Sequence, residues 1–131
     1  MKMMKEMGAN FIRVSHYPQD DALLEMCDKL GMLAWEEIPI IDIVPETPGY
    51  GDNCERNLRE MIRQHYNHPS IIAWGYMNEI LLVTQRKYKT ETELKPAIER
   101  ASSLAKKTGE STQSGRFYTR QCHGIPWQQQ L

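Results

Sequence analysis

Short apolar runs alternate with amphipathic stretches over the first 107 residues of the chain. The apolar runs are rich in β-branched and aromatic residues and are bounded by turn residues, a pattern typical of strands buried on both faces. They predict strands at residues 10–16, 32–39 and 71–79. The stretches between them repeat apolar side chains every three or four residues. This period predicts helices that end at Met7 and that span Gln19–Leu30, Asp52–His65 and Lys95–Lys107.

The regular alternation of strand and helix predicts an α/β fold with a parallel sheet, because consecutive parallel strands are joined by crossover helices. Gly8 and Gly31 follow the first two helices and predict where these end. Segments 40–52 and 82–92 carry turn and polar residues and are predicted to be loops. Three strands are too few to close a barrel, so we expect an open sheet.

The character of the chain changes after Lys107. Residues 108–131 show no apolar period, and they end in three glutamines and a leucine. We therefore predict that residues 1–107 form the folded domain and that residues 108–131 are an irregular tail.

Composition limits the classes of function. The 131 residues carry a net charge of −1, with 25% charged and 40% hydrophobic residues, as in an ordinary globular protein. The chain has no excess of basic residues that would favour binding to nucleic acid or to an anionic membrane. It also has no apolar run of about 18 residues, the length needed to cross a bilayer. The N-terminus lacks a signal peptide, so the compartment stays open, with the cytoplasm as the simplest interpretation. The three cysteines form no CxxC pair and no even disulfide set, and we expect reduced thiols.

Polar side chains lie toward the carboxyl end of each predicted strand. They are Arg13 and His16 on the first strand, Glu36 and Glu37 on the second, and Asn78 and Glu79 on the third. The carboxyl ends of parallel strands meet at one edge of a sheet, which is where α/β barrels build their active sites. These residues are therefore candidates for a site. The residues alone leave the alternative open that each strand simply returns to solvent there.

Other chemistry-bearing residues are expected to be structural. Cys27 lies on the apolar stripe of its helix and has no activating base nearby in sequence, so we expect it in the core. Trp35 is also expected to pack in the core. His65 and His68 straddle a helix end and a turn, and no third ligand follows at a standard spacing, so no metal site is expected.

Two blocks of sequence resemble a known family. Residues 67–79 read NHPSIIAWGYMNE and residues 8–18 read GANFIRVSHYP. Both resemble signature blocks of the family 2 glycoside hydrolases, which include β-galactosidases, β-glucuronidases and β-mannosidases. The resemblance implies that Glu79 is the catalytic acid/base and that Asn78 binds the sugar 2-hydroxyl. It also places Arg13, His16, Glu36 and Glu37 near the sugar.

The resemblance covers about residues 1–107 and implies three parallel strands with flanking helices from a (β/α)8, or TIM, barrel. Such a barrel needs about 250 residues, so the chain corresponds to part of one. The implied substrate is a β-glycoside, with β-galactosidase activity ahead of β-glucuronidase and β-mannosidase, and no cofactor is implied. Retaining hydrolysis needs a second, nucleophilic carboxylate. In the family it lies on a later strand, so we expect the chain alone to be inactive.

Other interpretations stay open. One is a non-catalytic α/β module that binds carbohydrate through Arg13, His16, Trp74 and Asn78. Another is an open reading frame that does not fold. Residues 122–130 can be back-translated so that another frame encodes family-like residues, which makes a frameshifted tail a further hypothesis. If the chain folds alone, its open sheet edges predict self-association.

Overall fold

The computed structural model describes residues 1–87, 90–110 and 117–121 and shows one parallel sheet with flanking helices. The elements in chain order are α1 (Lys2–Glu6), β1 (Phe11–Val14), α2 (Asp21–Leu30), β2 (Leu33–Glu37), α3 (Tyr50–His65), β3 (Ile71–Asn78), α4 (Leu82–Lys87), α5 (Glu91–Glu110) and β4 (Phe117–Gln121). The strand order is β1-β2-β3-β4, and all neighbours run parallel. The predicted α/β class with a parallel sheet and flanking helices is confirmed.

Local sequence signals set the limits of the first two helices. The carboxylate of Asp20 accepts a hydrogen bond from the Ala22 N–H at 2.8 Å and caps the start of α2. Gly31 ends α2 with a left-handed backbone, φ 61°, which costs glycine little. Gly8 follows α1 with φ 89° in the same way. The ends of both helices agree with the predictions to within one residue, and α2 begins two residues after the predicted Gln19.

The later helices differ from the predictions. Helix α3 begins at Tyr50, after the left-handed Gly49, and not at Asp52. Helix α4 occupies part of the predicted loop 82–92. Helix α5 begins at Glu91 because Thr90 and Glu93 form a capping box, with reciprocal bonds of 3.3 Å between each side chain and the other's backbone N–H. Pro96 therefore lies inside the helix and not in its first turn.

The tail contributes a fourth strand. Strand β4 pairs with β3 in a register that runs from Ala73 opposite Phe117 to Asn78 opposite Gln121. The prediction of three parallel strands with flanking helices holds for β1, β2 and β3, and β4 is a further strand within residues 108–131 that the sequence did not predict. A short edge strand is defined by the partner it pairs with, and residues 108–121 show no apolar period that would reveal it. The frameshift hypothesis concerns residues outside the described part of the chain and stays a prediction.

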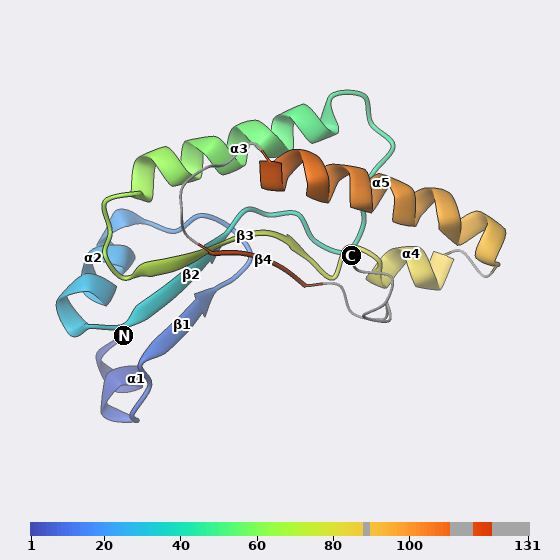
Figure 1. The fold of residues 1–131 in the computed structure, drawn as a ribbon. Helices are drawn as coiled ribbons and strands as arrows, with labels where there is room; N and C mark the ends of the chain where they lie inside the picture. The colour runs from blue at the N-terminus through green and yellow to red at the C-terminus, as the bar shows by residue number, and fades with distance from the viewer. Residues whose placement is uncertain (88–89, 111–116, 122–131) are drawn as a thin grey trace.

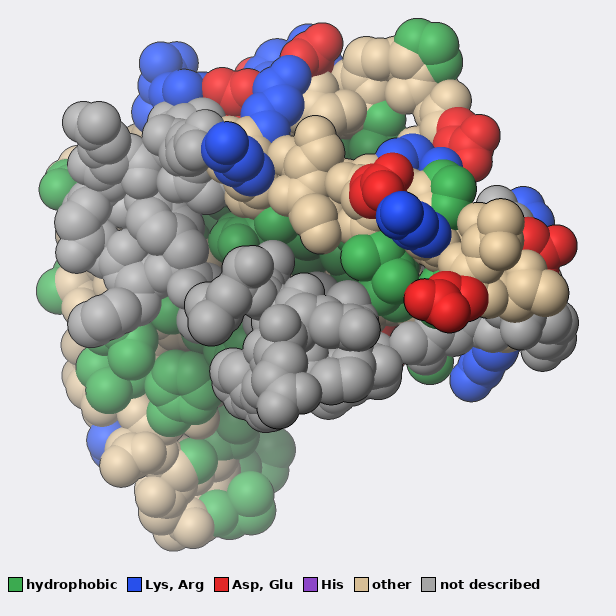
Figure 2. All heavy atoms as spheres, turned by 45° about the vertical axis from the view of Figure 1, so that its right-hand side comes forward, with side chains coloured by type: hydrophobic (Ala, Val, Ile, Leu, Met, Phe, Trp, Pro, Cys, Tyr) green, Lys and Arg blue, Asp and Glu red, His purple; other side chains and the backbone are tan. Residues whose placement is uncertain are grey.

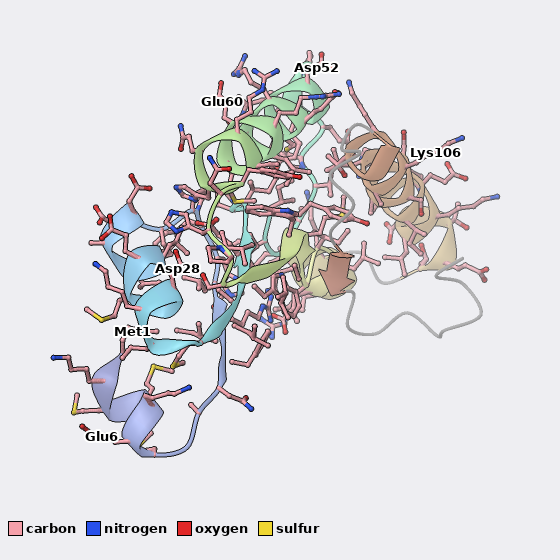
Figure 3. All side chains as sticks on the ribbon, turned by 60° about the vertical axis from the view of Figure 1, so that its left-hand side comes forward. Met1, Glu6, Asp28, Asp52, Glu60 and Lys106 are labelled. Atoms are coloured by element: carbon pink, nitrogen blue, oxygen red, sulfur yellow. The ribbon has the colours of Figure 1, made fainter. Side chains whose placement is uncertain are left out.

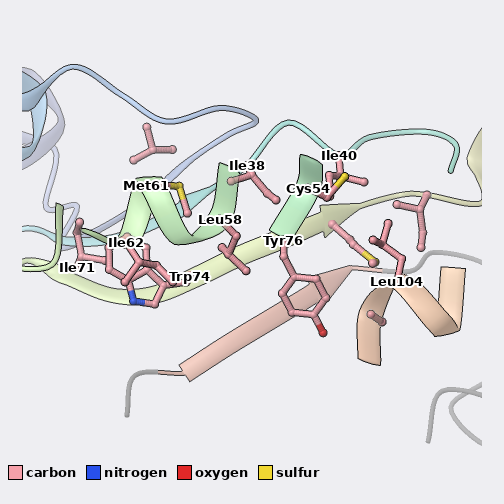
Figure 4. Close-up of a cluster of buried hydrophobic side chains, with 14 of the residues drawn as sticks. Ile38, Ile40, Cys54, Leu58, Met61, Ile62, Ile71, Trp74, Tyr76 and Leu104 are labelled. Atoms are coloured by element: carbon pink, nitrogen blue, oxygen red, sulfur yellow. The ribbon is translucent and has the colours of Figure 1, made fainter. Parts of the chain in front are cut away.

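The hydrophobic core lies between the sheet and the helices that cover one of its faces. Figure 1 shows α3 and α5 side by side over this face, and Figure 4 shows Trp74 of β3 beside Leu58, Met61 and Ile62 of α3. Trp74 is fully buried. Cys27 is also fully buried, which confirms its predicted place in the core, and burial raises the pKa of its thiol.

The two sides of the molecule differ in polarity. Lys, Arg, Asp and Glu side chains gather over α3 and α5, and Asp52, Glu60 and Lys106 project outward from these helices (Figures 2 and 3). On the opposite face of the sheet, the register partners Phe11 and Leu33 are 41% and 43% exposed. None of the helices in the described ranges is long and apolar enough to span a bilayer.

Candidate active site

Five of the six predicted site residues come from the carboxyl ends of three adjacent strands. Arg13 lies in β1 and His16 follows it, Glu37 ends β2, Asn78 ends β3 and Glu79 is the next residue. Parallel pairing of β1 with β2 and of β2 with β3 brings these ends to one edge of the sheet. This is the arrangement that the sequence predicted.

Glu37 is the centre of a hydrogen-bonded cluster. Its carboxylate is 1% exposed, and it accepts bonds from Arg13 Nε at 3.3 Å and from Arg13 Nη2 at 3.0 Å. His16 Nδ1 lies 2.6 Å from Glu37 Oε1. Arg13 Nη2 also donates to Asn78 Oδ1 at 2.7 Å. Arg13 therefore links the carboxylate of β2 to the amide of β3, and the buried charge of Glu37 is compensated.

The cluster orients the groups that remain available for a ligand. Because Asn78 Oδ1 accepts from Arg13, the amide NH2 group of Asn78 is left to donate to another partner. A carboxylate only accepts hydrogen bonds, so His16 carries its proton on Nδ1 and turns Nε2 away from Glu37. The structure thus orients the amide donor of the residue that directly precedes Glu79.

Trp35 supports this cluster, which corrects its predicted place in the core. Its side chain is half-buried on the same face as Arg13, and the guanidinium carbon lies 4.4 Å from the ring centroid. This is the geometry of a cation–π contact. The Trp35 ring therefore contacts the Arg13 guanidinium, and the carboxylate of Glu37 accepts its hydrogen bonds.

Gly75 is a site residue that sequence reasoning missed. A Cβ atom at this position would lie 2.5 Å from Trp35 Nε1 and 2.6 Å from Glu37 Cβ. Only glycine therefore lets β3 pass so close to the two side chains. A glycine inside an otherwise apolar strand is the signal that could have indicated such a close approach.

The sixth predicted residue, Glu36, lies on the opposite face of the sheet. It is 0% exposed and accepts hydrogen bonds from His65 Nδ1 of α3 at 2.8 Å and from the Gln19 N–H at 2.9 Å. His65 Nε2 in turn lies 3.2 Å from Asp21 Oδ1. The structure therefore does not bring Glu36 to the cluster around Glu37. Its contacts are with α3 and with the segment before α2.

Two further candidates from the sequence are placed away from the cluster. Trp74, considered as a carbohydrate contact, is fully buried against α3 and cannot reach a ligand. His68 Nδ1 binds Asp28 Oδ2 at 2.6 Å, beside the amino end of β3. Among the described residues, no group of three His, Cys, Asp or Glu side chains could hold a metal ion.

Comparison with known proteins identifies the family. Residues 1–100 match the model described as "Glycosyl hydrolases family 2, TIM barrel domain". The chain belongs to this family. Among solved structures, it is 77% identical to the Bacteroides uniformis β-glucuronidase 2 covalently bound to cyclophellitol-6-carboxylate aziridine, with a TM-score of 0.84 over 95% of this chain and 15% of that chain.

Two curated relatives of the chain carry different names. The chain is 36% identical over 126 residues to a β-glucuronidase of Bacteroides fragilis, covering 88% of this chain and 18% of the relative. It is 45% identical over 73 residues to a β-galactosidase of Thermoanaerobacterium thermosulfurigenes, covering 56% of this chain and 10% of the relative. The chain thus spans less than a fifth of the length of these relatives.

The comparisons also extend the family resemblance. The match to the Bacteroides uniformis enzyme covers 95% of the chain, which is more than residues 1–107 alone would allow. The predicted end of the resemblance near Lys107 was therefore too early. This extension agrees with β4, which lies between residues 117 and 121 and continues the parallel sheet.

Proposed function

We propose that this chain supplies the acid/base half of the active site of a retaining β-glycosidase, and that the complete enzyme acts on β-glucuronides. The observation that supports this proposal is the Arg13–Glu37–Asn78 cluster at the carboxyl ends of β1, β2 and β3. The cluster orients the amide of Asn78, the residue that directly precedes Glu79. A proton donor beside a hydrogen-bond donor for the sugar is what glycoside cleavage requires.

In this proposal, each residue has a distinct task. Glu79 protonates the leaving oxygen as the glycosidic bond breaks, and later deprotonates the attacking water. The Asn78 amide donates to the sugar 2-hydroxyl, a contact that strengthens as positive charge develops on the ring. Arg13 and Glu37 hold that amide in place, and His16 presents Nε2 to the sugar. Another segment of the barrel supplies the nucleophile, about 5–5.5 Å from Glu79.

The sugar is proposed from the relatives. The Bacteroides uniformis structure, at 77% identity over 95% of the chain, belongs to a β-glucuronidase, and its covalently bound compound carries a 6-carboxylate. The β-galactosidase matches over 56% of the chain at 45% identity. Glucuronide is therefore placed ahead of galactoside, although β-galactosidase was the leading expectation from the family resemblance, whose sequence blocks are shared across these activities. The β-galactosidase activity remains the second candidate.

The test uses a complete enzyme, made by replacing the matching segment of the Bacteroides uniformis β-glucuronidase with residues 1–107 of this chain. We expect Glu79→Ala to lower kcat by roughly 10²–10⁴-fold for glycosides with poor leaving groups, as expected for loss of a general acid. The loss should be small for activated aryl glycosides in the glycosylation step. Added azide should partly restore turnover, because this anion attacks the covalent intermediate without a base.

Two controls separate the parts of this proposal. Glu60→Gln changes an exposed carboxylate of α3 and should leave every rate unchanged. If Glu79→Ala lowers all substrates equally and azide has no effect, Glu79 is not the acid/base. Faster hydrolysis of galactosides than of glucuronides would instead overturn the proposed sugar. Binding of either sugar without turnover would favour the non-catalytic carbohydrate module.

The isolated chain is expected to be inactive, because this proposal assigns the nucleophilic carboxylate to another segment of the barrel. It is also expected to self-associate, since Phe11 and Leu33 expose an apolar stripe on the sheet face opposite the helices. Turnover by the isolated chain that disappears in Glu79→Gln would contradict the first expectation. A monodisperse monomer in sedimentation would contradict the second.

A further inference from the structure

The segment that carries Glu79 is held at both ends by a single residue, Asp42. The N–H of Asp42 donates to the carbonyl of Asn78 at 3.2 Å, and the carbonyl of Asp42 accepts from the Val83 N–H at 3.2 Å. Asn78 and Val83 directly precede and closely follow Glu79. Within the segment, the Leu82 N–H donates to the Glu79 carbonyl at 2.8 Å. Asp42 thus closes residues 78–83 into a clamped loop.

Asp42 achieves this through an unusual backbone conformation. Its φ is 65°, and the N–H of Ile43 donates to the carbonyl of Ile41 at 2.7 Å, so Asp42 is the central residue of a γ-turn. A γ-turn with positive φ is the rarer and more strained of the two forms. Glu79 is the other non-glycine residue with positive φ among those described, at 48°. One of these two residues, Asp42, is hydrogen-bonded to the residue that precedes the other at the end of β3.

Strained backbone persists only where the surrounding structure determines it, and such residues cluster at functional sites. The surroundings of Asp42 are well determined. The loop after β2 continues the pairing with β3, since the Ile38 N–H donates to the Gly75 carbonyl at 3.1 Å and the Asn78 N–H to the Ile40 carbonyl at 2.8 Å. The γ-turn ends this ladder and turns both peptide groups of Asp42 toward the Glu79 loop.

We propose that Asp42 is a positioning residue for the acid/base, acting through its left-handed backbone and not through its carboxylate. This inference rests on the proposed role of Glu79. Aspartate, asparagine and glycine adopt positive φ readily, whereas a β-branched residue does not. Replacements that keep the γ-turn should therefore keep the aim of Glu79, and replacements that oppose it should misplace the proton donor.

The test compares four variants of the complete enzyme defined above. Asp42→Asn and Asp42→Gly keep the turn and remove the carboxylate. Both should have a kcat within about threefold of the parent, because asparagine and glycine adopt positive φ at little conformational cost. Asp42→Val opposes the turn and should lower kcat at least about tenfold for poor leaving groups, while activated aryl substrates change little and KM is unchanged. Asp42→Ala should show the same selectivity to a smaller degree, and it serves if Asp42→Val folds poorly.

Gly31→Val is the matched control. Gly31 also has positive φ, 61°, but it ends α2 at the amino end of the sheet, away from Glu79. It should lower the thermal midpoint without any dependence on the leaving group. A loss in Asp42→Val that is equal for all substrates, or no loss at all, would overturn the proposal. If Asp42→Asn and Asp42→Gly lost as much kcat as Asp42→Val, the proposal would also be overturned, because the carboxylate and not the backbone would then position Glu79.

The outcome can be separated from that of the proposed function. Glu79→Ala is measured in parallel. If it shows the dependence on leaving group and Asp42→Val does not, only the role of Asp42 fails. If Glu79→Ala itself lacks the dependence, the proposed function fails first.

Discussion

Glu36 and Glu37 are neighbours of the same type and are equally buried, yet they belong to different parts of the molecule. Glu36 binds His65 on the helix that covers the core. Glu37 binds Arg13 and His16 at the carboxyl ends of the strands. Successive side chains of a strand point to opposite faces, so one residue of the pair joins the core and the other joins the site. Residue type and burial alone do not distinguish a structural carboxylate from a functional one.

What distinguishes the two carboxylates is the reach of their partners. Both satisfy the requirement that a buried charge be paired and hydrogen-bonded. His65 and the Gln19 backbone tie Glu36 to α3 and to the segment before α2. Arg13, in contrast, extends from Glu37 to Asn78 and is partly exposed. The first network holds layers together, and the second holds groups that a ligand can meet.

The largest expected effect breaks the core side of this comparison. Glu36→Leu in the complete enzyme should lower the free energy of unfolding by about 3–5 kcal/mol, because His65 stays buried without its main partner. The double variant Glu36→Leu, His65→Leu should recover most of this loss, since apolar residues replace the whole pair. Denaturant unfolding measures both. Full stability in the single variant together with lost activity would place Glu36 in the site instead.

The next effect breaks the site side. Glu37→Gln removes the charge that binds Arg13 and His16. The fall in kcat/KM should correspond to about 1.5–3 kcal/mol of lost transition-state stabilisation, the contribution of hydrogen bonds to a charged group. Stability should fall less than in Glu36→Leu, because Arg13 and His16 reach solvent. Steady-state kinetics beside the unfolding curve gives both values. Glu36→Gln is the matched control and should change the kinetics less than the stability.

A smaller effect tests the support of Arg13. Trp35→Leu keeps an apolar side chain and removes the aromatic face. The fall in kcat/KM should therefore correspond to about 0.5–2 kcal/mol of lost transition-state stabilisation, the range of cation–π contacts. Trp35→Phe retains an aromatic face and should lose less. Equal losses in the two variants would show that the ring acts through packing and not through Arg13.

The smallest effect concerns a paired carboxylate at the amino end of the sheet. Burial raises the pKa of Asp28, but hydrogen bonds from Ser70 and from His68 outweigh it and hold this pKa below its usual value. A lowered pKa in the folded state means that ionised Asp28 adds stability above about pH 3.9, the usual value, and loses it as the pH falls further. Asp28→Asn should cost about 1 kcal/mol at pH 7. The difference should shrink as the pH falls below about 3.9, as followed by unfolding at each pH.

Local signals were sufficient for much of the fold and for most of the site. Turn residues and apolar periods located β1, β2, β3 and α2, and the polar strand ends indicated Arg13, His16 and Glu37 as neighbours. They failed where pairing or capping decides. The capping box of Thr90 and Glu93 starts α5 four residues before the predicted position, and β4 exists as a partner of β3. Neither feature depends on an apolar period.

The sequence by itself determined the class of fold, the family and the edge of the sheet where the polar residues meet, because these follow from periodicity, turn chemistry and two dense motifs. Only the tertiary structure decided which glutamate faces the site, since a shift of one residue in a strand reverses its faces. It also decided that Trp35 supports Arg13, that Gly75 must lack a side chain and that Asp42 clamps the loop of Glu79. Each of these depends on a neighbour from another strand, and local sequence carries no record of that neighbour.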